Sequence, residues 1–230
     1  MKRRNEIILA ILVLALAALA CNAVTGGGDG GGDPTGPTST PSPRVILSDD
    51  FSSPQWGRGT DADSSIEYSN GTLQVIVYTT NYFVWSTPND QDYQNIHMEV
   101  TAINNGSDSR TAFGLMCNQQ VGADSSFYYF AVTPAGQYAI AKATAGESDV
   151  ILTKNAEWAF SDLIAENAAS YRVGADCGNG TLTLYVNGQQ IDSVADASYV
   201  SGGVALFAYT SDEVVSSNVS FDDFLMTELP

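Results

Sequence analysis

The sequence predicts an all-β domain, built as a sandwich or barrel of short antiparallel strands, and three observations lead to this class. From Val45 onward, short runs rich in Val, Ile, Tyr, Phe and Thr alternate with Gly, Asn, Asp, Ser and Pro. No long stretch repeats apolar residues at the 3.6-residue period of a helix. Asn-Gly pairs begin at positions 70, 179 and 187, and such pairs supply the positive φ angles that tight hairpins need.

The chain begins with a segment typical of a secretory signal peptide. Lys2, Arg3 and Arg4 precede an uncharged apolar run over residues 7–20. Such a run reaches only about 21 Å as a helix, which is short of the roughly 30 Å hydrocarbon core of a bilayer. We therefore expect residues 1–20 to be a signal peptide rather than a membrane-spanning helix.

The signal segment ends in Ala18-Leu19-Ala20-Cys21, which resembles the lipobox of bacterial lipoproteins. In a typical lipobox, leucine stands three residues before the cysteine, where this chain has Ala18. The resemblance implies an exported bacterial protein that is anchored to a membrane at the cell surface or envelope by an acyl group on Cys21. The alternative is an ordinary signal peptide cut after Ala20, which leaves Cys21 as a free thiol.

Residues 21–43 are predicted to be a flexible tether. They consist almost wholly of Gly, Asp, Thr, Ser and Pro, so they cannot bury enough apolar surface to fold. The remaining residues, 44–230, have the length of one domain with its own core. A lipid, a tether and a folded domain in series indicate a protein that works at a surface.

The net charge narrows the classes of partner. The full chain carries −17, and removal of residues 1–20 takes away three basic residues and one acidic residue, which changes this value to −19. Nucleic acid and anionic lipid headgroups are therefore disfavoured, because both repel an acidic domain. Cations, neutral polymers and basic proteins remain as classes of partner that this charge does not disfavour.

Within the domain, several runs have clear strand patterns. Residues 72–78 and 181–186 each place three apolar side chains on one face, and 128–132 with 137–142 flank a Pro-Ala-Gly turn as a hairpin. Residues 162–169 are faintly helical, for a turn or two at most. Cys117 and Cys177 each end a strand-like run, and an exported domain permits disulfides, so we expect them to pair. Two buried free thiols are the alternative.

The order of the predicted strands and their amino-acid sequences resemble those of the concanavalin A-like lectin/glucanase superfamily over nearly all of residues 46–228. The segments that carry this resemblance include Ser48-Asp49-Asp50-Phe51, Phe127-Tyr128-Tyr129-Phe130, Leu184-Tyr185-Val186-Asn187-Gly188 and Phe221-Asp222-Asp223-Phe224. The resemblance implies a jelly roll of two curved antiparallel sheets, in a superfamily with laminin G-like and glycoside hydrolase members. Such a fold does not by itself fix a function.

The resemblance also implies that the first and last strands are neighbours, which brings Asp50 close to Asp222 and Asp223. Relatives often hold a structural calcium ion there, and calcium prefers six to eight oxygen ligands. These residues are therefore candidate calcium ligands. The alternative is that they are outward-facing residues beside core phenylalanines.

The sequence favours a binding domain over an enzyme. Retaining glucanases of the superfamily carry their carboxylates on one strand as E-x-D-x-x-E, which this chain lacks. Glu99 is the nearest strand carboxylate and has no acidic partner two or four residues away, so a glycosidase would need a non-standard pair from separate strands. His97 is the only histidine and receives no role.

Aromatic residues are the candidate ligand-binding residues, because aromatic faces can pack against the C–H faces of sugars. Tyr128, Tyr129, Tyr138 and Trp85 lie in or near adjacent predicted strands, with Trp85 and Tyr138 expected as exposed platforms and Trp56 and Trp158 as alternates. Three functions remain: a surface domain that binds carbohydrate, which we expect; a structural or adhesion domain that binds a protein; and a glycoside hydrolase. An ordinary sheet core would also explain the aromatics.

Overall fold

The computed structural model describes residues 42–120 and 126–229. The predicted signal peptide, Cys21 and almost the whole predicted tether lie outside this part of the chain. The described residues form strands and turns, with one 3₁₀ turn at Lys154–Ala156. None of their helical segments has the length and apolar character needed to cross a membrane.

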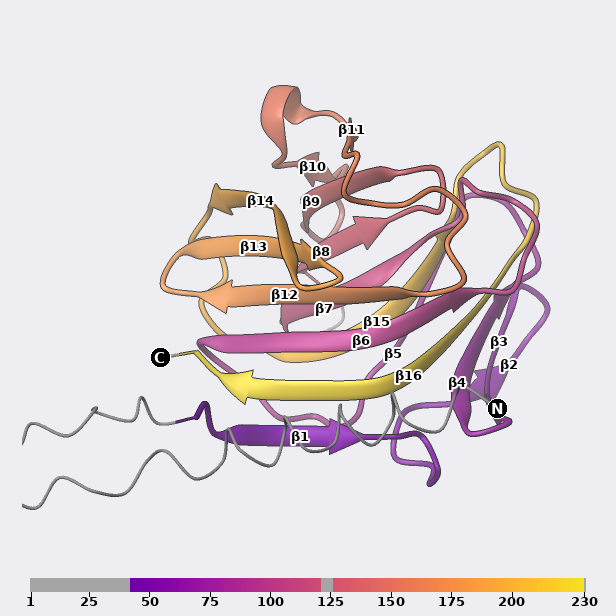
Figure 1. Cartoon of the computed structure of the whole chain (residues 1–230), viewed down its shortest axis with the longest axis horizontal. Coiled ribbons are helices and arrows are strands. Elements are labelled where there is room, and N and C mark those ends of the chain that lie inside the picture. Colours follow the sequence, from indigo (N-terminus) through magenta and orange to yellow (C-terminus); the bar gives the residue numbers. More distant parts are fainter. Residues whose placement is uncertain (1–41, 121–125, 230) are drawn as a thin grey trace, which may run out of the picture. The chain divides into compact units, whose positions relative to one another are not determined.

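Sheet A has nine antiparallel strands (Figure 1). Their order is β14 (Gln189–Ala195), β13 (Thr181–Val186), β12 (Tyr171–Gly178), β6 (Ile96–Asn104), β16 (Ser217–Glu228), β4 (Thr72–Val77), β3 (Ser64–Ser69) and β2 (Gly59–Thr60), with β1 (Val45–Asp49) paired to β16. β4 pairs with the first half of β16 and β1 with the second half. The first and last strands are therefore neighbours, as the resemblance implied.

Sheet B has seven antiparallel strands. Their order is β10 (Val150–Ile151), β9 (Gln137–Ala143), β8 (Phe127–Val132), β7 (Ala112–Gln119), β15 (Gly203–Thr210) and β5 (Tyr82–Ser86), with β11 (Ala159–Phe160) paired to β9. The two short strands β10 and β11 lie beside β9, at the top of Figure 1.

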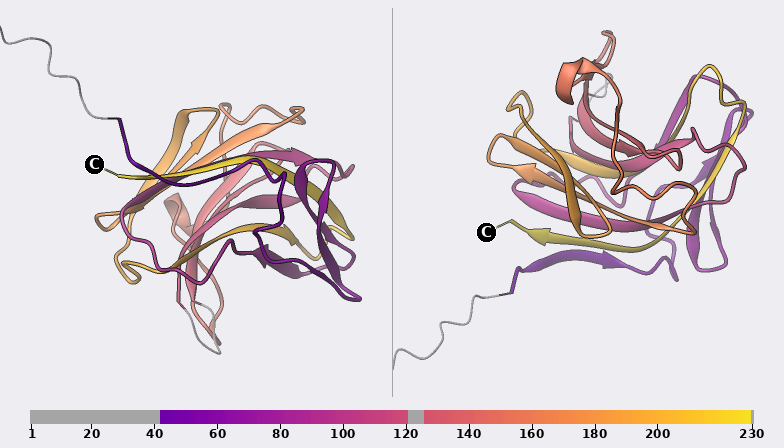
Figure 2. Two further views of the ribbon diagram at one scale, coloured as in Figure 1. Left: turned by 90° about the horizontal axis from the view of Figure 1, so that it is seen from below. Right: turned by 45° about the horizontal axis from the view of Figure 1, so that its top comes forward.

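The two sheets stack face to face around one hydrophobic core (Figure 2). On β4, Leu73, Val75 and Val77 are fully buried, and they form the single apolar face that the alternation predicted. Residues 182, 184 and 186 of β13 do the same. The prediction of a two-sheet antiparallel sandwich is confirmed.

The predicted hairpin turns have the expected backbone. Asn70, Asn179 and Asn187 have φ angles of 53°, 55° and 52°, and each is followed by a glycine with φ between 72° and 78°. Successive positive φ angles produce the tight turn that matches the twist of the flanking strands. The Asn-Gly pairs therefore fix the β3–β4, β12–β13 and β13–β14 connections.

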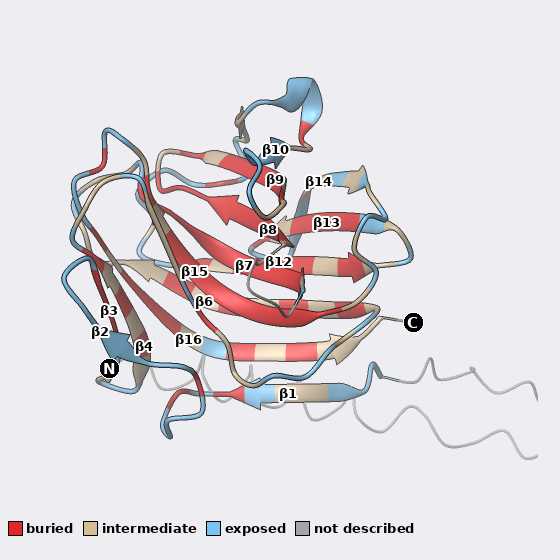
Figure 3. Ribbon diagram, turned by 180° about the vertical axis from the view of Figure 1, so that it is seen from behind, coloured by how far each residue is buried: buried red, intermediate tan, exposed pale blue. Residues whose placement is uncertain are grey.

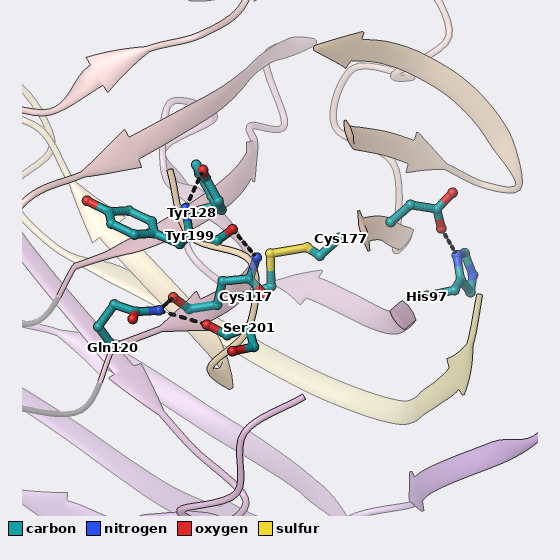
Figure 4. Close-up of a disulfide and its surroundings, with 9 residues drawn as sticks. His97, Cys117, Gln120, Tyr128, Cys177, Tyr199 and Ser201 are labelled. Carbon is teal, nitrogen blue, oxygen red and sulfur yellow. Dashed lines mark hydrogen bonds and ion pairs between the residues drawn. A yellow bond between two sulfur atoms is a disulfide. The ribbon is translucent and has the colours of Figure 1, made fainter. Parts of the chain in front are cut away.

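A disulfide bond joins Cys117 of β7 to Cys177 of β12, as predicted (Figure 4). The two Cα atoms are 6.6 Å apart, and both residues are buried in the core. Because β7 belongs to sheet B and β12 to sheet A, the bond connects the two sheets through the core.

Residues 162–169 contain no helix, so the faintly helical prediction for this connection is wrong. The backbone N–H of Asn167 donates to the carbonyl of Pro134, in the β8–β9 turn, rather than to a carbonyl four residues earlier. Ile164 is buried in the core. Tertiary contacts, rather than helical hydrogen bonds, therefore hold the connection against the sandwich.

Candidate functional site

A second apolar cluster covers the outer face of sheet B, the face turned away from the core. Strands with an exposed outer face normally alternate buried and exposed residues, yet all six residues of β8 are buried (Figure 3). Alternate residues of β8, Phe127, Tyr129 and Ala131, belong to this outer cluster, whereas Tyr128 and Phe130 belong to the core. Sheet B is thus apolar on both faces.

The outer face of sheet B contains a cavity of about 360 Å³, which we call the aromatic cavity. Seven of its ten lining residues are aromatic. The lining consists of Phe83, Trp85, Ala112, Phe127, Tyr129, Ala131, Asp149, Trp158, Phe207 and Tyr209.

Strand alternation positions most of the aromatic side chains. β5, β8 and β15 each contribute two aromatic residues that are two positions apart, so both members of each pair lie on one face. The register places Phe207 opposite Trp85. The ring of Phe83 stacks on that of Phe207, with centroids 4.7 Å apart and an interplanar angle of 13°. The aromatic floor is therefore set by packing between strands.

The long connection after β9 supplies the remaining wall. Asp149 immediately precedes β10, and Trp158 immediately precedes β11. Each of these short strands pairs with β9 at two residues, which holds the connection along the edge of sheet B. Asp149 and Trp158 thereby reach a cavity whose floor lies on other strands.

The aromatic cavity contains one carboxylate among its lining residues, that of Asp149. The hydroxyl of Tyr129 donates to Oδ2 of Asp149 over 3.0 Å. Burial, and then the Asp149 charge, raises the pKa of Tyr129 well above its ordinary value, so the phenol remains a donor. Burial also raises the pKa of Tyr209, with further contributions from Asp212 and Asp149.

Two further hollows adjoin the aromatic cavity, each of about 390 Å³. The first, which we call the polar hollow, shares Ala112, Trp158 and Tyr209 with the cavity and adds Arg110, Thr133, Gln137, Ser211, Asp212 and Glu213. The second shares Phe83 and Trp85 and reaches Arg58 and Asp61. The cavity and its two hollows therefore adjoin one another at these shared residues.

The structure places two of the four predicted ligand-binding aromatics at this cavity. Trp85, which is 37 % exposed, and Tyr129 line it. Tyr128 and Tyr138 lie in the core between the sheets instead, and the expectation that Tyr138 is an exposed platform is wrong, because only 8 % of it is exposed. Its position opposite Val132 in the β8–β9 pair turns it inward.

Of the two alternate platform residues, Trp158 and Trp56, one lies at the cavity and the other in the core. Trp158 lines the aromatic cavity, whereas Trp56 is buried in the core, where its indole N–H donates to Asp49 over 3.0 Å. Sequence reasoning missed Phe207, Tyr209 and Asp149 as lining residues. The Phe-x-Tyr spacing in β15 was a usable signal for the first two, because it gives the same alternation as Phe127 and Tyr129.

The candidate calcium ligands do not form a metal-binding group in the structure. Asp50 and Asp222 each accept a backbone N–H close by in the chain, from Ser52 and Asp223 respectively. Across residues 42–120 and 126–229, no three His, Cys, Asp or Glu side chains come together in a way that could hold a metal ion. Neighbouring strands therefore bring the aspartates into one region without assembling a carboxylate cluster.

A polar network covers part of the outer face of sheet A. Nδ1 of His97 lies 2.6 Å from Oδ1 of Asp176 (Figure 4), and its Nε2 lies 3.4 Å from Glu99. Tyr185 donates to Asp176, and Arg172 pairs with Glu99. The hydrogen bond to Asp176 is the largest effect on the pKa of His97 and raises it above its ordinary value of 6.5, although partial burial opposes this.

We expect this histidine to make stability depend on pH. Because the pKa of His97 is higher in the folded chain, its stabilising contribution is complete below about pH 6.5 and is lost as the pH rises through the folded value. His97→Gln should therefore lower the free energy of unfolding more at about pH 5.5 than at about pH 8.5. Urea unfolding at both pH values checks this. Since His97 is the only histidine, an equal loss at both values would contradict the expectation.

No protein-family model and no curated protein matches this chain. Solved structures do share its fold. A carbohydrate-binding module, CBM66 from Bacillus subtilis, superposes with a TM-score of 0.59 at 11 % identity, covering 76 % of this chain and 96 % of the module. A Bacillus licheniformis beta-glucanase gives 0.53 at 10 % identity, covering 81 % and 99 %.

A third similar structure is a Bacillus subtilis protein of unknown function with a galectin-like fold, with a TM-score of 0.59 at 10 % identity over 80 % of this chain and 96 % of that protein. At such low identities, the likeness establishes the fold alone. The domain has the jelly-roll sandwich fold of these carbohydrate-binding and glucanase structures.

Proposed function

We propose that the protein is a surface-anchored, non-catalytic domain that binds carbohydrate in the aromatic cavity. The observation that carries this proposal is the cavity itself: seven aromatic side chains gathered on the outer face of one sheet. Ligand sites are concave and mostly apolar, with a few placed polar groups, and this cavity has that composition. The similar structures include a carbohydrate-binding module, which supports the same ligand class.

Sugar rings suit these walls because their C–H faces are apolar while their edges carry hydroxyl groups. Trp85 and Trp158 border the cavity and are partly accessible to solvent, so their rings can cover a sugar face. The adjoining polar hollow offers hydrogen-bonding side chains, including Gln137 and Thr133, for hydroxyl groups at the edge of the ligand. The cavity and its two adjoining hollows together fit a chain of sugar units better than a single one.

Glycoside hydrolysis is a weaker proposal for this cavity. Glycosidases need two carboxyl groups, about 5–5.5 Å apart for retention or about 6.5–9.5 Å apart for inversion. Asp149 is the single carboxylate among the residues that line the aromatic cavity. The polar hollow contains two carboxylates, of which Glu213 forms an ion pair with Arg110 and Asp212 is the other. A protein-binding surface is the other alternative, and a cavity of about 360 Å³ favours a small or thin ligand over a flat partner.

Replacing Trp85 by alanine is expected to weaken glycan binding by about tenfold or more, since it removes one stacking wall worth on the order of 1.4 kcal/mol. A glycan array with the purified domain identifies a ligand, and calorimetry then compares wild type and variant. Because Trp85 is 37 % exposed and packs against Phe83 and Phe127, the variant should lose some thermal stability, so binding is compared at a temperature at which both proteins are folded.

Phe160→Ala is the matched control, because Phe160 is 72 % exposed and is not part of the cavity lining. A loss of binding in this variant equal to that of Trp85→Ala, or no glycan signal at all, would reject the proposal. The same assay on intact cells tests the anchor: cells that express Cys21→Ala should release the glycan-binding protein into the medium.

A further inference from the structure

The hydrogen-bonding groups of the aromatic cavity are few for a neutral sugar. The side chains that line it offer two phenol hydroxyls, two indole N–H groups and the carboxylate of Asp149. Its lining includes no Asn, Gln, Ser, Thr, Lys, Arg or His. Neutral sugars carry several hydroxyls, each of which needs a partner once water is excluded. The cavity therefore suits a ligand that binds to the faces of the protein's aromatic rings and to the single negative charge of Asp149.

Asp149 is free to receive a positive charge. Within the described residues, it forms no ion pair, although Arg44, Arg110, Lys142 and Arg172 all pair with other carboxylates. Its Oδ2 accepts the hydrogen bond from Tyr129, which holds the carboxylate at the cavity. In the same part of the chain no hydrogen bond from the protein reaches Oδ1, and Asp149 is exposed. The hydrogen bond from Tyr129 thus positions one oxygen of an exposed carboxylate.

Acidic residues outnumber basic ones beyond the cavity. Asp212 and Glu213 line the polar hollow on one side, and Asp61 lines the second hollow together with Arg58. Arg110, the basic residue of the polar hollow, is already paired with Asp108 and Glu213. The whole chain carries a net charge of −17, so its field attracts cations and repels anionic polymers.

We infer that the aromatic cavity selects an amino sugar, that is, a glycan unit with a free ammonium group. This inference rests on the proposed function and narrows its ligand class. An ammonium group is attracted to the face of an aromatic ring within about 6 Å, and tryptophan is the strongest partner. The sugar ring stacks on one aromatic wall while its ammonium group forms a charge-assisted hydrogen bond with Asp149. N-acetylation removes this charge. Acetylated units therefore lose the attraction of the ammonium group to the aromatic faces and the charge-assisted hydrogen bond with Asp149, but keep the stacking of the sugar ring.

The test compares hexamers of β-1,4-linked glucosamine, N-acetylglucosamine and glucose by calorimetry at about pH 5.5. Wild type should bind the glucosamine hexamer at least about tenfold more tightly than the other two, as expected for one charge-assisted contact. Asp149→Asn keeps the size of the side chain and an acceptor for Tyr129 but removes the charge, so it should lose about that same factor.

Asp162→Asn is the matched control. Asp162 is exposed and is not part of the cavity lining, yet its replacement changes the net charge by the same amount. It should change affinity by less than about twofold, because the effect of a distant surface charge is screened by salt. If Asp162→Asn weakens binding as much as Asp149→Asn, general electrostatic attraction explains the result and the inference is wrong.

A competition experiment separates recognition of the ammonium group from screening. Tetramethylammonium chloride should displace the glucosamine hexamer more effectively than sodium chloride at equal ionic strength, because only the former binds aromatic faces well. Equal displacement by the two salts would contradict the inference. Choline that binds more tightly than the hexamer would assign the cavity to a cation that is not a sugar, and would overturn both proposals.

The two proposals fail in different ways. If a neutral hexamer binds wild type as tightly as the glucosamine hexamer, and only Trp85→Ala weakens it, the cavity binds carbohydrate and the amino-sugar inference is wrong. If none of the three hexamers binds and the glycan array gives no signal, the proposed function is wrong as well.

Discussion

Replacing both Cys117 and Cys177 by alanine is expected to lower the free energy of unfolding by about 4 kcal/mol and the melting temperature by roughly 10 °C. The bond closes a loop of 60 residues, and removing it increases the conformational entropy of the unfolded chain. The effect should be large because the bond connects two sheets that otherwise meet through side-chain packing and a few side-chain hydrogen bonds, such as that from Tyr138 to Asp192. Calorimetry and urea unfolding of purified wild type and variant measure it.

The two single variants provide the control. Cys117→Ala and Cys177→Ala each break the same bond, so each should cost nearly as much stability as the double replacement. If the two single losses instead add up to the loss of the double variant, the cysteines contribute only through separate packing. That outcome would show that they do not pair in the folded protein.

Gly114→Ala is expected to cost about 3 kcal/mol or more, because the new methyl group has no space. A Cβ atom at Gly114 would lie 1.9 Å from the carbonyl oxygen of Phe130 and 3.4 Å from the ring of Phe207. The first atom belongs to the backbone of the neighbouring strand, so β7 and β8 would have to separate. Since Phe207 lies in the floor of the aromatic cavity, ligand binding should weaken together with stability.

Gly59→Ala is the matched control for this prediction. A Cβ atom at Gly59 has no neighbouring atom within 4 Å, so the same chemical change should leave the melting temperature almost unaltered. Thermal unfolding of the two variants side by side separates a steric effect from a general effect of alanine. A Gly114→Ala domain as stable as Gly59→Ala would mean that the β7–β8 pair does not have the spacing described above.

The sequence predicts the sandwich well because its signals are local. Alternation fixes the inward face of β4 and β13, and the Asn-Gly pairs fix three turns. Pairing of Cys117 with Cys177 was predicted from the export signal and the even number of remaining cysteines, and the positions of β7 and β12 in opposite sheets bring the two together. Residues 162–169 misled the prediction, since their backbone partners lie in a distant turn.

The aromatic cavity was predictable only in part. In β8, apolar residues occupy every position, so periodicity cannot tell the core face from the outer face. This is why Tyr128 and Tyr129 were equal candidates, although only Tyr129 lines the cavity. Asp149 could not be predicted as a lining residue from the sequence. Its position depends on the pairing of β10 and β11 with β9 at two residues each, and such short pairings leave no recognisable sequence pattern.

The double-sided burial of β8 places two sets of requirements on one short segment. Its even-numbered residues, such as Tyr128 and Phe130, pack in the core, and its odd-numbered residues, such as Phe127 and Tyr129, shape the cavity. Substitutions at odd positions can therefore change the lining of the aromatic cavity while the fold is conserved. A one-residue insertion or deletion in β8 would turn the core residues outward and the cavity residues inward. The cavity-facing positions of β8 can therefore change in residue type, but the strand cannot change in length.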